Sequence, residues 1–92
     1  MISLQDLIGF CDLTPDEVSA IAEHEHVAEP LAAVLGASLL HSEHGPEQIR
    51  DMLVDDIRTA VRRHDVPHAR NVVATLRHFL HEHPDAGFHR AP

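Results

Sequence analysis

Recurring helix start signals are the feature that most constrains how this chain can fold. At "TPDE", Thr14 can act as the N-cap, Pro15 as the first helical residue and Glu17 as the acid that completes a capping box. Ser3 followed by Asp6 offers a second start of this kind. Prolines and a capping aspartate recur between the later apolar segments, so the sequence predicts a series of short helices.

The spacing of apolar residues between these signals predicts five helices, over residues 3–11, 14–28, 30–41, 46–64 and 65–83. The last two helices carry clear apolar stripes at helical spacing, formed by Ile49, Leu53, Ile57, Ala60 and Val61 and by Ala69, Val72, Val73, Leu76, Phe79 and Leu80. The sequence shows no alternating strand pattern and no internal repeat. We therefore expect an all-α fold, a compact bundle of about five short helices with short connections.

The third predicted helix, "PLAAVLGASLLH", is apolar on nearly every side, which is typical of a central buried helix. The chain has 92 residues, and a domain of this size buries only about 60 to 65% of its unfolded surface. One chain would have difficulty covering such a helix, so we expect a homodimer. We expect residues 1–84 to form a single helical domain and residues 85–92 to be a frayed tail.

Composition narrows the classes of function. The net charge is −8 with His neutral, which disfavours binding to nucleic acid or to anionic membranes. Cys11 is the single cysteine, so a disulfide within the chain and a cysteine-based zinc knuckle are excluded. The start of the sequence lacks a basic signal region, and no apolar run approaches the roughly 18 residues of a spanning helix. We therefore expect a cytoplasmic protein without membrane contact.

Ten histidines are the unusual feature of the composition, and protonating all of them would bring the net charge from −8 to +2. Most fall at the ends of predicted helices: His24, His26, His41, His64, His81 and His83. A cation near a helix C-terminus stabilises the helix by about 0.3 to 1 kcal/mol when it is exposed. Helix termination alone can therefore explain most of these imidazoles.

Metal binding is the alternative explanation. If consecutive helices are antiparallel, one end of the bundle gathers Glu23, His24, Glu25, His26, Glu29, His64 and His68, and the other gathers His41, Glu43, His44, His78, His81 and His83. Imidazoles and carboxylates at spacings of two to four residues suit Fe, Zn, Ni or Cu. A haem b at a dimer interface, with one axial His from each subunit, is a related possibility. Our candidate metal ligands are Glu23, His24, Glu25, His26, His41, His44, His64, His68, His78 and His81.

The helix pattern also predicts the surroundings of two acidic residues, Glu25 and Asp56. Glu25 continues the stripe of Val18, Ile21 and Ala22, so we expect it to face inward and to need a partner. Asp56 lies at the edge of its helix's apolar stripe, where it could meet Arg77 or a His, although a solvated flank is the simpler expectation. No nucleophile elbow, Gly-rich phosphate loop or H-E-x-x-H motif is present, so catalysis has little support.

The segments "LTPDEVSAIAEHEHVAE" and "LGASLLHS" resemble small all-α, His-rich proteobacterial proteins of unknown function. This resemblance implies a single compact domain and carries no activity. Two hypotheses of function follow from the residues. The protein binds a transition metal or haem for storage, transfer or sensing; alternatively, it is a cofactor-free homodimeric interaction module whose histidines are helix ends or a pH-responsive rim.

Overall fold

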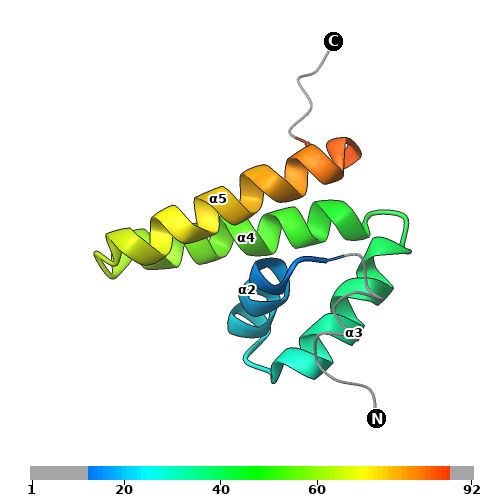
Figure 1. Ribbon diagram of the computed structural model, residues 1–92, viewed down its shortest axis with the longest axis horizontal. Coiled ribbons are helices and arrows are strands. Elements are labelled where there is room, and N and C mark those ends of the chain that lie inside the picture. The colour runs from blue at the N-terminus through cyan, green and yellow to red at the C-terminus, as the bar shows by residue number, and fades with distance from the viewer. Residues whose placement is uncertain (1–12, 88–92) are drawn as a thin grey trace.

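The computed structural model describes residues 13–87, and this part of the chain contains four α-helices and one turn of 3-10 helix (Figure 1). The elements are α2 (Pro15–Glu25), α3 (Glu29–Leu40), α4 (Gly45–Arg62), α5 (Val66–Glu82) and η1 (Pro84–Ala86). The prediction of an all-α fold is confirmed. The helix predicted over residues 3–11 and its Ser3 cap lie outside the described residues.

Two of the predicted helix starts are confirmed by their capping hydrogen bonds. The Thr14 hydroxyl oxygen accepts a hydrogen bond from the Glu17 backbone N–H at 3.2 Å, and a Glu17 carboxylate oxygen accepts one from the Thr14 N–H at 2.9 Å. These are the two bonds of a capping box, so α2 begins where the sequence places it. At α5, the Asp65 carboxylate accepts a hydrogen bond from the His68 N–H at 3.2 Å.

The α4–α5 hairpin is the longest part of the molecule (Figure 1). The two helices run antiparallel and pack along their apolar stripes, while α2 lies across both of them and α3 packs against α2 and α4. The core lies where α2 meets the hairpin, and its fully buried side chains include Ile21, Ile49, Leu53 and Phe79. This arrangement brings the end of α2 onto the middle of the hairpin.

The expectation that residues 30–41 form a central buried helix is wrong. α3 lies at the edge of the fold, does not pack against α5, and leaves Leu31 and Val34 57% and 54% exposed. Its fully buried residues are the small Ala32, Ala33 and Gly36, while Leu35, Leu39 and Leu40 pack against the core and stay partly exposed. A side chain at position 36 would crowd the side chains of Leu13 and Ile21, which would have to shift to make room for it. The apolar residues on its outer side remain uncovered within residues 13–87.

The packed part of the chain extends beyond residue 84, where the sequence predicted the end of the domain. The η1 turn places Ala86 in full burial against the hairpin. The Arg50 guanidinium donates hydrogen bonds to the backbone oxygens of Ala86 and Gly87, at 2.9 and 3.3 Å. Residues 84–87 are therefore part of the domain, and the rest of the expected tail lies outside the described residues.

Candidate functional site

Four of the described histidines lie where helices end, as their spacing predicted. His26 is the C-cap of α2, His41 that of α3 and His83 that of α5, while His64 directly follows the C-cap of α4. His26 and His64 have positive φ angles of 57° and 58°, in the left-handed region that reverses the chain after a helix. Their positions thus have a structural explanation that needs no ligand.

The structure brings together part of the first predicted cluster, at the junction where α2 crosses the hairpin. A Glu23 carboxylate oxygen lies 2.8 Å from Nε2 of His68 on α5, and Nε2 of His24 lies 3.3 Å from a carboxylate oxygen of Asp55 on α4. Each contact pairs an imidazole with an acid from another helix. The α2 end is therefore tied to both helices of the hairpin by polar side chains.

Asp56 is the buried residue of this junction, and the expectation of a solvated flank is wrong. Its side chain is only 4% exposed, and Oδ2 has no hydrogen-bond partner. Burial raises the pKa of Asp56 to about 6, the negative charges of Glu23 and Asp55 add to the increase, and His24 and His68 oppose it. The sequence contained the signal, because residues 49, 53, 56 and 60 follow one helical stripe and all four are buried.

A polar cavity of about 310 Å³ opens beside Asp56. The acids Glu23 and Asp55 line it together with Asp56, and so do polar and basic residues of α2 and α4: His24, His26, Thr59, Arg62 and Arg63. Nδ1 of His24 is a second buried atom here without a hydrogen bond, since its nearest acid, Glu25, is 3.7 Å away. The cavity therefore combines unsatisfied buried polar atoms with both signs of charge.

Glu25 does not face inward as expected. The side chain is exposed at the last residue of α2, because the helix ends there and its final turn extends beyond the core. The buried acid of α2 is instead Glu17, which is 2% exposed. Burial raises the pKa of Glu17, while its hydrogen bonds with Thr14 and the nearby His78 and His83 act in the opposite direction.

The second predicted cluster is not assembled in the described structure. His44 lies 3.3 Å from Glu47 in its own helix start, His41 and His81 are exposed, and His78 is an exposed residue of α5. Among residues 13–87, no group of three or more His, Cys, Asp or Glu side chains is arranged to hold a metal ion.

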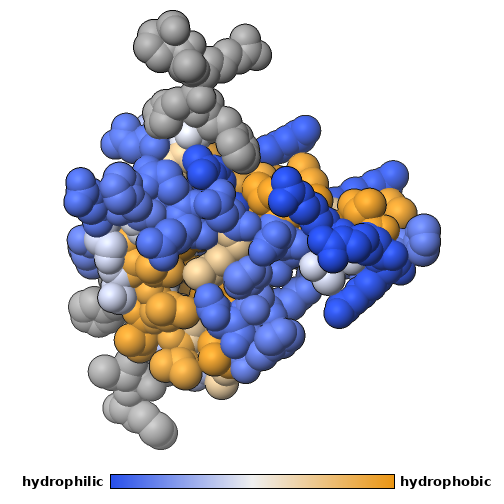
Figure 2. Space-filling view, turned by 180° about the vertical axis from the view of Figure 1, so that it is seen from behind, coloured by the Kyte–Doolittle hydropathy of each residue, from blue (hydrophilic) through white to orange (hydrophobic). Residues whose placement is uncertain are grey.

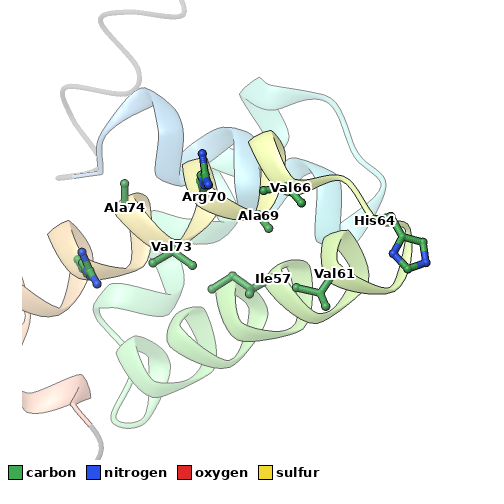
Figure 3. A pocket seen from close by; sticks show the side chains of 9 residues that line it. Ile57, Val61, His64, Val66, Ala69, Arg70, Val73 and Ala74 are labelled. Atoms are coloured by element: carbon green, nitrogen blue, oxygen red, sulfur yellow. The ribbon is translucent and has the colours of Figure 1, made fainter.

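An apolar groove lies between α4 and α5 (Figure 3). It has a volume of about 610 Å³, and Ile57 and Val61 of α4 face Val66, Ala69 and Val73 of α5 across it. His64 lies at the turn between the helices, and Ala74, Arg70 and Arg77 complete the lining. Val61 and Val66, on the two helices that line the groove, are 59% and 53% exposed.

Figure 2 shows the apolar and hydrophilic residues on the opposite face of the molecule from that seen in Figure 1. Apolar side chains gather on the side where α3 lies and again on the projecting hairpin, with hydrophilic residues between them. Sequence reasoning had assigned the apolar residues of α4 and α5 to helix packing. It did not identify Arg70 and Arg77 beside them, because only the crossing of the helices shows which face stays open.

Comparison with known proteins finds no matching family model, no matching curated protein and no matching solved structure. None of the helices within residues 13–87 is long and apolar enough to cross a membrane. A proposal of function therefore starts from two features of this fold, the apolar α4–α5 groove and the polar cavity at Asp56.

Proposed function

We propose that this protein is an interaction module that binds an acidic amphipathic helix of a partner protein in the α4–α5 groove. The observation that supports this most directly is the groove itself, in which Val61 and Val66 are more than half exposed beside a concave apolar surface. Helices that dock in grooves insert apolar side chains at positions i, i+3, i+4 and i+7. A groove between two antiparallel helices can accept such a stripe.

The charges around the groove favour an acidic occupant. Arg70 and Arg77 line it and His64 lies at one end, whereas no carboxylate lines it. The sequence of α2 and α3 contains no Arg or Lys, while the hairpin carries arginines at positions 50, 58, 62, 63, 70 and 77. Acidic residues beside an apolar stripe would meet the guanidinium groups of Arg70 and Arg77, which steers association and selects against basic helices.

A synthetic helix of about 18 residues, with a leucine stripe flanked by glutamates, tests the proposal by fluorescence anisotropy. The same peptide with lysines in place of glutamates is the control. We expect the acidic peptide to bind and the basic one to fail, with affinity falling as salt is added. Replacing both Arg70 and Arg77 by Gln should weaken binding and reduce its dependence on salt.

The apolar contribution is tested by Val61→Ser combined with Val66→Ser. Burying one valine contributes about 1.5 kcal/mol, so each substitution should weaken binding about tenfold. Leu31→Ser with Val34→Ser is a matched control, because these α3 residues are equally exposed and lie outside the groove. Equal loss in both double variants would contradict the groove as the binding site, as would a peptide that binds regardless of its charge.

A further inference from the structure

The polar cavity beside Asp56 is distinct from the groove and contains features that helix packing leaves unexplained. Oδ2 of Asp56 and Nδ1 of His24 are buried without hydrogen-bond partners, although buried polar atoms in folded proteins are nearly always paired. Asp56 is only 4% exposed, and it lines the cavity. A group that donates a hydrogen bond into this cavity would satisfy the Asp56 carboxylate.

The carboxylates that surround the cavity make a cationic donor the best match for Asp56. Asp55 and Glu23 also line the cavity, but each is already paired with an imidazole, Asp55 with His24 and Glu23 with His68. Of the three acids that line the cavity, Asp56 is thus the one without an ion pair to another residue of the described structure. An ammonium group can donate a hydrogen bond to the carboxylate of Asp56 where that residue lines the cavity, and it balances the negative charge at the same time.

Arg62 and Arg63 line the same cavity and indicate an anionic group on the ligand. Neither guanidinium makes an ion pair or a hydrogen bond to another of the described residues, although three carboxylates line the cavity with them. A free metal ion is a poor match for a cavity that carries two arginines. A molecule with opposite charges at its two ends matches both sets of residues.

We propose that this cavity binds a small zwitterionic ligand, with its ammonium group on Asp56 and its carboxylate on Arg62 and Arg63. The volume of about 310 Å³ lies at the lower end of small-molecule sites, which suits a molecule the size of an amino acid. Ionised Asp56 is required, so binding should weaken as the pH falls below about 6, the pKa to which burial raises this residue. The proposal does not depend on the function of the groove.

Titration of the isotopically labelled protein with β-alanine, 4-aminobutyrate and 6-aminohexanoate, followed by NMR, tests this site. The series varies the distance between the two charges, and butylamine and butyrate each supply only one of them. We expect saturable shifts of backbone amides at residues 23–26 and 55–63 for at least one zwitterion at pH 7.5. Each single-charge compound should bind at least tenfold more weakly.

Asp56→Asn should weaken binding of that zwitterion at least tenfold, because the amide keeps the shape and removes the charge. Glu43→Gln is the control, since it removes a carboxylate that is exposed and far from the cavity lining. Arg62→Gln with Arg63→Gln should reduce the affinity to that of butylamine. The proposal is overturned if no zwitterion shifts these amides, if Asp56→Asn binds as well as the wild type, or if Zn²⁺ alone binds stoichiometrically at the same residues.

Discussion

At the scale of single residues, Asp56 is a side chain whose buried environment makes stability depend on pH. Burial and two neighbouring acids raise its pKa from 3.8 to about 6, so the folded state binds this proton more tightly than the unfolded state. Stability therefore falls as the pH rises through the interval between those two values. The penalty is complete above about pH 6, and the difference in pKa corresponds to about 3 kcal/mol.

Asp56→Asn should remove this penalty. Compared with the wild type, we expect the variant to be more stable at pH 7.5 by about 1 to 3 kcal/mol, with a difference that shrinks towards pH 4.5. Urea denaturation at several pH values measures it. Glu43→Gln should track the wild type throughout, because Glu43 is on the surface. A variant that is less stable than the wild type at pH 7.5 would contradict the assignment.

The change in stability with pH tests the predicted binding of a metal or haem by the histidines. A ligating imidazole must be neutral, so acid would release a bound ion and remove the stability that it supplies. Without an ion, protonation of Asp56 between pH 7.5 and 5.5 should raise stability. We expect thermal unfolding of the untagged protein to show this gain, unchanged by chelation. A loss of stability in acid that chelation abolishes would support metal binding instead.

At the scale of helices, two left-handed chain reversals mark where α2 and α4 end. His26 and His64 adopt φ angles near +57°, and such a conformation costs a non-glycine residue about 1 kcal/mol. The capping box of α2 and the Asp65 cap of α5 fix the opposite ends. Helix limits in this protein are therefore set by interactions between residues close in sequence.

Glycine at each left-handed position should stabilise the fold. We expect His26→Gly and His64→Gly each to raise the free energy of unfolding by about 0.5 to 1 kcal/mol, because glycine adopts this backbone without strain. His41→Gly is the matched control: His41 also caps a helix, but its φ is −92°. It should show no gain. Equal effects of all three substitutions in thermal unfolding would mean that backbone strain is not the cause.

At the scale of the whole molecule, α3 leaves apolar surface uncovered on the described part of the chain. Leu31 and Val34 are more than half exposed on its outer side, away from the α4–α5 groove. The homodimer predicted from the sequence would cover this surface and leave the groove free for its proposed partner. Self-association and helix binding would then use different faces.

Sedimentation equilibrium tests this arrangement. We expect the wild type to dimerise at high micromolar concentration and Leu31→Ser with Val34→Ser to shift the equilibrium towards monomer, because each loses apolar burial across the interface. Val61→Ser with Val66→Ser should leave the dimer intact. A wild type that stays monomeric contradicts the homodimer, and a dimer lost only in the Val61 and Val66 variant would place a second copy in the groove.

The sequence by itself determined where helices begin and end. Thr14, Glu17 and Asp65 cap their helices through hydrogen bonds that span three residues, so the necessary partners are visible in the sequence. The same holds for the histidines at helix ends. Apolar stripes at helical spacing also identified the core residues of α4 and α5, because periodicity determines which residues share a face.

Only the tertiary structure decided how those faces meet. The stripe of α4 includes position 56, but whether an aspartate there is solvated or buried depends on where α2 crosses the hairpin. The pairing of Glu23 with His68, 45 residues away, follows from the same crossing. The composition of α3 predicts a central helix, but the helix lies at the edge of the fold and leaves Leu31 and Val34 exposed. Helix periodicity specifies a face but not its neighbour, since crossing positions depend on the shapes of all side chains packed together.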